Sequence, residues 1–309
     1  LAHTAVSPCG NKLLVLEKGV LTLKGNLEGS LEGLPDNLSK AYWISSDRLI
    51  CTRQDPPELF IWNLKGNLEK SIRFPESKTL KSRYLEASQT ILVARNFINS
   101  RRILLNRFDA TSLELITSSQ MRFSETMWAT FENPLVVSFS SRGEKVAIRT
   151  ERSHILVHDV LSGDLIKDLA NEDYSIQGQA LSPDGNTLAY ATRKRPYIEI
   201  YDLLGDRPIT TLKGHNLVLY QMSFSPDGKR LVSSSIGYSP LILWDTKKWS
   251  QVASLPITPG SVSPVTRFSQ GSDNLIIYES LLDSNTRNVR ILKAPSLTEI
   301  ENSGNATGQ

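Results

Sequence analysis

The sequence has few of the features that would assign it to a special class of protein. It contains two cysteines, Cys9 and Cys51, which lie far apart and are typical of reduced thiols in a cytosolic protein rather than of a disulfide framework. It lacks a signal-peptide pattern and any run of about 18 apolar residues, so it predicts no membrane span. We therefore expect a cytoplasmic location.

The chain also lacks the motifs of the common catalytic and cofactor sites. There is no nucleophile elbow, phosphate-binding P-loop, dinucleotide fingerprint or Cys-x-x-Cys pair. His154 and His158 are close in sequence, but in an extended strand their spacing separates them by about 13 Å, and no Cys or Glu completes a metal site. We therefore predict no cofactor, no metal site and no enzymatic activity.

Strong charge is missing as well, since a net charge of +3 over 309 residues does not by itself indicate nucleic-acid binding. With 39% hydrophobic and 22% charged residues, the composition is that of a soluble globular protein. What the chain has instead is a long series of short apolar segments rich in β-branched and aromatic residues. No convincing amphipathic helix interrupts them, so the sequence predicts an all-β fold.

A short turn recurs between these segments. Ser225-Pro226-Asp227-Gly228 is the clearest copy, and proline and glycine there supply a fixed and a permissive φ. Close or degraded copies end at residues 10, 47, 89, 143, 185, 228 and 273, which gives a period of about 43 residues. That period is the repeat length of a four-stranded propeller blade.

The end of each third predicted strand carries a second repeated feature, an aromatic or histidine ring followed by Asp or Asn. The five copies are Trp62-Asn63, Phe108-Asp109, His158-Asp159, Tyr201-Asp202 and Trp244-Asp245. In the sixth repeat Gly214-His215 also precedes the first strand. Gly-His, the Ser-Pro-Asp-Gly turn and Trp-Asp in this order resemble the WD40 repeat.

The resemblance implies an all-β, seven-bladed, WD40-like β-propeller of four-stranded antiparallel blades, formed as a single domain by residues 1–301. The predicted blades are residues 1–34, 35–75, 76–118, 134–170, 171–213, 214–256 and 257–301. Residues 118–134 are predicted to be an aromatic-rich insertion between blades, which either packs along the barrel side or exposes an apolar patch to a partner. Residues 302–309 are predicted to be a disordered tail.

The same resemblance assigns structural roles in the sixth repeat. In WD40 proteins a His, a strand Ser or Thr, the Trp and a turn Asp form a buried hydrogen-bond network. His215 and Trp244 match by position, Ser234 or Ser235 is expected to supply the hydroxyl, and Asp245 follows the tryptophan. The turn Ile-Gly-Tyr-Ser-Pro holds no Asp, so we expect an incomplete network and a structural rather than catalytic His215.

Arginine placement is the least ordinary feature. The second predicted strand of four consecutive blades ends in Arg53, Arg95, Arg149 or Arg193, and all four are expected on the same side of their strands. Loops that follow second strands form one rim of a propeller, so the rim is predicted to be basic over blades two to five and, from Glu279, more acidic towards the seam. Neighbouring candidates on this rim are Arg101, Arg102, Arg152, Lys194, Arg195, Tyr197 and Tyr238.

These arginines fit two interpretations. They are either ordinary solvated cations, some paired with acids such as Glu58, or a recognition surface for carboxylate or phosphate. From the second we predict a non-catalytic protein–protein interaction scaffold, a WD40 domain of a larger regulatory protein, which docks an acidic or phosphorylated segment on the rim. Nucleic-acid binding on the same rim is the alternative, and a propeller hydrolase is a third hypothesis.

Overall fold

The structure, a computed structural model, describes residues 3–6, 12–17, 20–25, 29–30, 37–97, 102–121, 136–150, 154–170, 176–269, 274–281 and 287–293. These residues form strands and turns, and the 3-10 helix η1 (Glu86–Ser88) is the only helical element among them. The chain divides into two compact units, residues 1–151 with 155–168, and residues 152–154 with 169–309.

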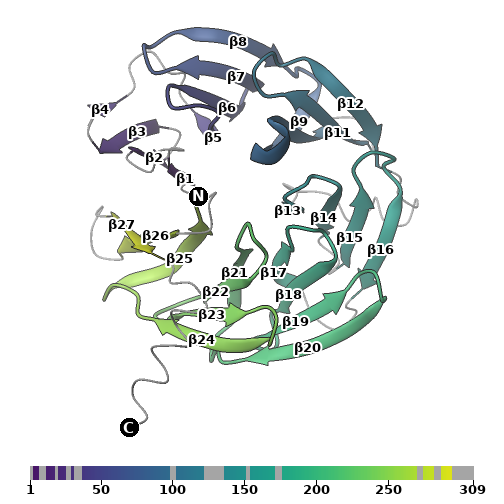
Figure 1. The fold of residues 1–309 in the computed structure, drawn as a ribbon, viewed down its shortest axis with the longest axis vertical. Helices are drawn as coiled ribbons and strands as arrows, with labels where there is room; N and C mark the ends of the chain where they lie inside the picture. Colours follow the sequence, from purple (N-terminus) through teal and green to yellow (C-terminus); the bar gives the residue numbers. More distant parts are fainter. Residues whose placement is uncertain are drawn as a thin grey trace. The chain divides into compact units, whose positions relative to one another are not determined.

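The first unit contains four sheets, in each of which the strand order follows the chain (Figure 1). The first and second sheets comprise β1 (His3–Val6), β2 (Lys12–Glu17), β3 (Val20–Gly25) and β4 (Gly29–Ser30), then β5 (Leu38–Trp43), β6 (Arg48–Gln54), β7 (Pro57–Asn63) and β8 (Leu68–Arg73). The third and fourth comprise β9 (Ser77–Leu85), β10 (Thr90–Phe97), β11 (Ile103–Asp109) and β12 (Leu115–Gln120), then β13 (Val136–Phe139), β14 (Lys145–Arg149), β15 (His154–Asp159) and β16 (Leu165–Ala170).

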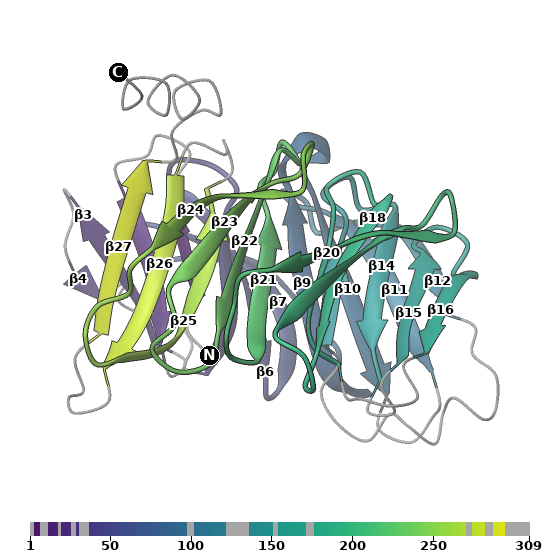
Figure 2. The same ribbon diagram turned by 90° about the horizontal axis from the view of Figure 1, so that it is seen from below.

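The second unit contains three sheets built in the same way, as Figure 2 shows for β21 to β24. They comprise β17 (Ile176–Leu181), β18 (Thr187–Thr192), β19 (Tyr197–Asp202) and β20 (Arg207–Lys213), then β21 (Leu219–Phe224), β22 (Arg230–Ser235), β23 (Leu241–Asp245) and β24 (Ser250–Leu255), and finally β25 (Ser261–Phe268), β26 (Asn274–Leu281) and β27 (Arg287–Lys293). The all-β prediction of four-stranded antiparallel blades is thus confirmed.

The predicted number of seven four-stranded blades is not confirmed. Among the described residues six sheets have four strands and the last sheet has three. The strand expected to complete the last sheet, residues 297–300, and the expected tail, residues 302–309, lie outside the described residues. The single closed ring of blades also stays a prediction of the sequence.

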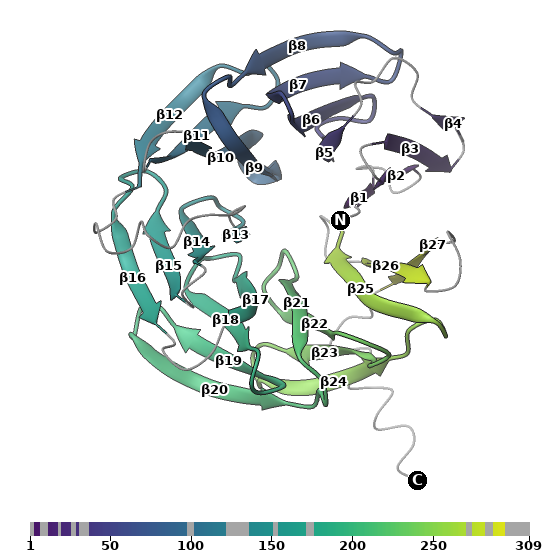
Figure 3. The same ribbon diagram turned by 180° about the vertical axis from the view of Figure 1, so that it is seen from behind.

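In the first unit the sheets pack face to face as consecutive blades, with the first strand of a blade against the blade before it. Strand β5 contacts β1 and β2, and β9 contacts β6 and β7 (Figure 3). A separate apolar core fills each of these spaces. Trp43 and Phe60 lie between the first and second blades, and Ile61 and Phe108 between the second and third. Burying both faces of each sheet in this way is the source of blade stability.

The second unit repeats this packing. Strand β21 contacts β17 and β18, and β25 contacts β21 and β22. Leu231 and Trp244 point into the core shared with the preceding blade, while Val232 and Leu243 point into the core shared with the following one. The alternation follows from the two-residue period of a strand, which sends neighbouring side chains to opposite faces.

The serine of the repeated turn closes that turn with its side chain. In the 225–228 turn Ser225 Oγ donates to Asp227 Oδ1 at 2.5 Å and accepts from Arg230 N at 2.9 Å. Ser182 makes the same pair of bonds to Asp184 and Thr187. Gly228 has φ +73°, the left-handed conformation that glycine adopts without strain. The recurrence of this turn in the sequence therefore reflects a conserved geometry within the chain.

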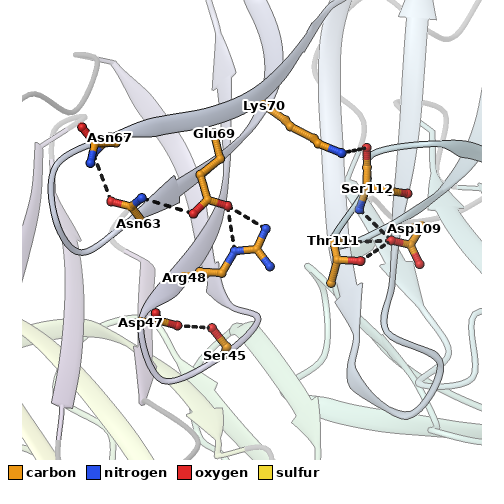
Figure 4. Close-up of polar contacts among 10 residues, drawn as sticks. All are labelled: Ser45, Asp47, Arg48, Asn63, Asn67, Glu69, Lys70, Asp109, Thr111 and Ser112. Carbon is orange, nitrogen blue, oxygen red and sulfur yellow. Dashed lines mark hydrogen bonds and ion pairs between the residues drawn. The ribbon is translucent and has the colours of Figure 1, made fainter.

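The Asp or Asn after each ring closes the turn between the third and fourth strands. Asp245 Oδ1 accepts from Lys247 N and Lys248 N at 2.6 and 3.0 Å. Figure 4 shows the equivalent Asp109, whose Oδ1 accepts from the Thr111 hydroxyl and from Ser112 N. These bonds favour the carboxylate and lower the pKa of Asp109 to about 2. The ring residue and the Asp that follows it thus combine a buried ring with a carboxylate that holds the turn.

The segment predicted as an insertion begins differently from the expectation. Residues 118–120 belong to β12, and Met121 is buried in the core between the third and fourth blades. Ser119 Oγ donates to Val160 O across the same space. The rest of the predicted insertion, from residue 122, lies outside the described residues.

Candidate interaction surface

Three loops of the second unit form a basic and apolar surface, which we call the loop face. They are residues 193–197, from the end of β18 to the first residue of β19, residues 213–218, from the last residue of β20 to the start of β21, and residues 236–240 between β22 and β23. In antiparallel blades these connections lie at the same end of the strands. The opposite end carries the Ser-Pro-Asp-Gly turns.

Cations of the loop face are exposed. Arg193, Lys194, Arg195 and Lys213 are all exposed, and the Lys213 Nζ lies 5.3 Å from the centre of the Tyr197 ring. The three loops contain these four cations and no Asp or Glu, whereas the whole chain has a net charge of +3. The loop face thus carries four positive charges, while the rest of the chain sums to a net charge of −1.

Apolar side chains adjoin these cations. Tyr238 is 62% exposed, Leu217 43% and Ile236 42%. The two loops that carry them are joined, because Ile236 N donates to Val218 O at 2.9 Å. Leu217 also lies 3.1 Å from the place that a Cβ at Gly237 would take, and Gly237 has φ +76°. Exposed aromatic and aliphatic groups beside arginine are the composition of interface hot spots.

The predicted arginines of the first unit have structural contacts instead. Arg53 forms an ion pair with Glu58, which is 5% exposed and also binds Arg73 Nε at 3.3 Å. The pair follows from the β6–β7 hairpin, whose register sets Arg53 opposite Glu58. Because a buried carboxylate requires a partner, Arg53 is held by the fold.

Arg95 is likewise engaged. Its Nε donates to Ser77 Oγ at 3.1 Å, and its guanidinium lies 4.4 Å from the centre of the Phe74 ring. Burial lowers the pKa of Arg95 from its ordinary value, with a smaller opposing effect from Glu76. Arg102 remains exposed, and it binds Gln120 and lies over Phe97.

The other predicted rim residues are placed as follows. Arg149 is half-buried at the end of β14, and Arg193 lies one residue beyond β18 rather than within it. Arg101 and Arg152 lie outside the described residues. Since Arg53, Arg95, Arg102 and Arg149 belong to the first unit and Arg193, Lys194, Arg195, Tyr197 and Tyr238 to the second, a single rim joining both sets stays a prediction.

An acidic seam from Glu279 is not supported. Glu279 is fully buried and accepts hydrogen bonds from Thr258 N at 2.8 Å and from Arg290 at 3.1 Å. Its charge is therefore neutralised inside the last blade rather than displayed on a rim.

A buried hydrogen-bond network lies directly beneath the loop face. Ser233 Oγ accepts from Trp244 Nε1 at 2.8 Å and lies 2.7 Å from His215 Nε2. The hydroxyl of the network is therefore Ser233, and the prediction of Ser234 or Ser235 was wrong. Both of those hydroxyls are buried and have no hydrogen-bond partner among the described residues.

The network ends at His215, as the missing turn aspartate suggested. His215 Nδ1 is buried and has no hydrogen-bond partner within the described part of the chain, and burial lowers the pKa of His215 to about 4. The imidazole is therefore neutral at pH 7, and its Nε2 accepts a hydrogen bond from the Ser233 hydroxyl. This arrangement anchors the 213–218 loop to the blade and serves a structural purpose.

Within the described part of the chain, no group of three or more His, Cys, Asp or Glu side chains is arranged to hold a metal ion. No helix described there is long and apolar enough to cross a membrane.

Sequence reasoning missed Lys213, Leu217 and Ile236 on the loop face. A local signal for them existed, because residues 193–197, 213–218 and 236–240 contain no acid. A search for acid-free loops at one end of the predicted blades would have identified this face.

Known proteins resemble the chain over part of its length. It is 26% identical over 106 residues to WD repeat and SOCS box-containing protein 1 of Xenopus tropicalis, which is 34% of this chain and 25% of that protein. The Homo sapiens protein of the same name is 26% identical over 107 residues, again 34% of this chain and 25% of the relative. The chain thus matches about a quarter of the length of these relatives.

A second WD-repeat-like match has a different name. Intraflagellar transport protein 122 homolog of Xenopus tropicalis is 34% identical over 84 residues, which cover 27% of this chain and 7% of that protein. No protein-family model matches the chain. The local similarity to WD repeat proteins, together with four-stranded antiparallel blades in both units, confirms the WD40-like character recognised in the sequence.

Proposed function

We propose that the chain is a non-catalytic scaffold module that binds an acidic protein segment on the loop face of the second unit. Similarity to WD repeat proteins and the blade architecture support a protein-interaction scaffold in general. The acidic partner follows from one observation, the four exposed cations beside Tyr197, Tyr238 and Leu217 without a carboxylate in the same loops. Complementary charge favours encounter with an acidic segment, and the aromatic groups supply contact area.

The residues expected to carry binding differ from the full predicted set. Arg193 and Arg195 supply planar guanidinium groups, which suit carboxylate or phosphate. Arg53 and Arg95 are left out of the proposed surface. Arg53 already forms an ion pair with Glu58, and Arg95 already contacts Ser77 and the Phe74 ring.

Fluorescence anisotropy with a labelled peptide of alternating glutamate and tyrosine tests the proposal. The double charge reversal Arg193→Glu with Arg195→Glu is expected to weaken binding at least ten-fold. The matched control is Lys229→Glu with Lys247→Glu, which makes the same charge change on exposed side chains at the other end of the strands. Binding that falls equally in both variants, or in neither, would overturn the proposal.

Labelled single-stranded DNA provides the comparison with nucleic acid. The proposal expects the acidic peptide to bind more tightly than a DNA strand of equal charge, because tyrosine and Leu217 contacts add to the electrostatic attraction. Tighter DNA binding with a steep loss of affinity in salt would favour the nucleic-acid alternative instead.

A further inference from the structure

The 236–240 loop of the loop face contains the dipeptide Ser239-Pro240. A serine or threonine followed by proline is the acceptor motif of proline-directed protein kinases. Four such pairs in this chain have a described hydroxyl, at Ser182, Ser225, Ser239 and Thr258. The four hydroxyls differ in their surroundings, and this difference decides which of them can react.

Three of the four hydroxyls are locked by the fold. Ser182 and Ser225 lie in the Ser-Pro-Asp-Gly turns, where each Oγ donates to an aspartate at 2.5 Å. Thr258 Oγ1 donates to the fully buried Glu279 at 2.5 Å. A kinase must place an accessible hydroxyl next to its nucleotide. The hydrogen bonds of these three hydroxyls would therefore have to break before any of them could be phosphorylated.

Ser239 has none of these constraints. Its Oγ has no hydrogen-bond partner among the described residues, and Ser239 and Pro240 belong to neither a strand nor a turn. Ser239 itself is half-buried, and its neighbours Tyr238 and Pro240 are exposed. A residue before proline is biased towards the extended conformation, which is the conformation in which protein kinases hold their substrates.

Phosphorylation of Ser239 would change the charge of the loop face. Gly237, two residues earlier, packs against Leu217, and the loop that carries Leu217 begins at Lys213 beside Tyr197. The serine therefore shares a surface with the four cations of the loop face. A phosphoserine carries about −1.5 to −2 charges at pH 7 and would offset up to half of the positive charge there.

We propose that Ser239 is a phosphorylation site that weakens binding of an acidic partner to the loop face, an inference that rests on the function proposed above. Ser239 Oγ attacks the γ-phosphorus of ATP bound to a proline-directed kinase. The Oγ–P bond forms, the bond from the γ-phosphorus to ADP breaks, and the hydroxyl proton leaves to the kinase, so ADP and a proton are released. The phosphate then repels acidic segments and competes for the same guanidinium groups.

Incubation of the folded full chain with a proline-directed kinase and ATP tests the modification, with phosphopeptide mapping by mass spectrometry. We expect phosphate on Ser239, none on Ser182 or Ser225, and no incorporation at this loop in Ser239→Ala or Pro240→Ala. Circular dichroism of both variants checks that they fold. Phosphorylation of the locked turns in preference to Ser239 would refute the site.

Anisotropy with the glutamate–tyrosine peptide then tests the regulation. Phosphorylated protein is expected to bind roughly ten-fold more weakly, a change that corresponds to about 1.4 kcal/mol. Equal affinity of phosphorylated and unmodified protein would overturn the regulatory effect while leaving the mapped site in place. Failure of the peptide to bind even the unmodified protein would refute the proposed function and this regulation, and the mapping result would still decide whether Ser239 is modified.

Discussion

Three consecutive serines of β22 offer a sharp test of the buried network, because all three are fully buried and differ only in their partners. Ser233 Oγ is hydrogen-bonded to Trp244 Nε1 and His215 Nε2, whereas the hydroxyls of Ser234 and Ser235 have no partner in the part of the chain that the structure describes. Replacement of each by alanine removes the same single oxygen atom from the same strand. Only the replacement of Ser233 should nevertheless destabilise the protein.

The magnitude follows from what each substitution leaves behind. Ser233→Ala strands a buried indole N–H and a buried imidazole nitrogen, and an unsatisfied buried group costs roughly 1–3 kcal/mol. We therefore expect Ser233→Ala to lower the free energy of unfolding by about 3 kcal/mol. Ser234→Ala and Ser235→Ala remove hydroxyls that are already unsatisfied, so we expect between no change and a gain of about 1 kcal/mol.

Urea unfolding followed by circular dichroism measures the midpoint and slope for each variant. Hydrogen–deuterium exchange of peptides from β22 and β23 localises the effect, since local opening reports the stability of that blade. A loss in Ser235→Ala as large as that in Ser233→Ala would refute the assignment of the network. Equal stability of Ser233→Ala and the native chain would refute the cost assigned to its two partners.

Further predictions concern the same blades. The pKa of His215 is depressed to about 4 in the folded state, so the unfolded chain binds more protons below pH 6.5. The free energy of unfolding should therefore fall by about 3 kcal/mol as the pH drops from 6.5 to 4. A His215→Gln variant, unfolded in urea at several pH values, should lose this dependence. Glu58→Gln should cost about 2 kcal/mol in thermal or urea unfolding because Arg53 is left partly buried without its anion, while Glu69→Gln at the more exposed pair with Arg48 should cost less than about 1 kcal/mol. Asp245→Ala should lower the free energy of unfolding by about 1–2 kcal/mol, because two hydrogen bonds to backbone amides are lost. Asp245→Asn should retain most of that stability, because Asn63 fills the same role in the second blade. Equal loss in both variants would contradict this account of the turn.

Turn chemistry made the blades predictable from the sequence. A Ser-Pro-Asp-Gly turn depends on local hydrogen bonds between Ser225, Asp227 and the following backbone, so its residue types appear wherever the geometry does. The same holds for the Asp after each ring, which accepts hydrogen bonds from the backbone amides two and three residues further on. Such local constraints leave a period that can be read without knowledge of distant contacts.

The partner of Trp244 was not predictable at the level of single residues. Trp244 faces the same core as Leu231, which lies opposite it in the ladder. Strand alternation then places Ser233 on that face and excludes Ser234. Ser235 shares the face, but it is four residues from Leu231, which is about 13 Å along a strand and beyond the reach of the indole. The prediction of Ser234 or Ser235 was made without the register of the next strand, and that register selects Ser233.

The arginines show why a charge pattern alone does not define a binding surface. The sequence predicted cations at the ends of second strands. The two-residue turn between β6 and β7, however, sets Glu58 opposite Arg53, and the two charges neutralise each other within the hairpin. Arg193 lies beyond its strand and has no such acid opposite it among the described residues, and the neighbouring loops contain no Asp or Glu. The quantity that distinguishes the two is the charge that remains exposed after cross-strand pairing. Judged by that quantity, the loop face of the second unit is where an acidic partner would be attracted, and the first-unit arginines Arg53 and Arg95 are part of the scaffold that holds their blades together.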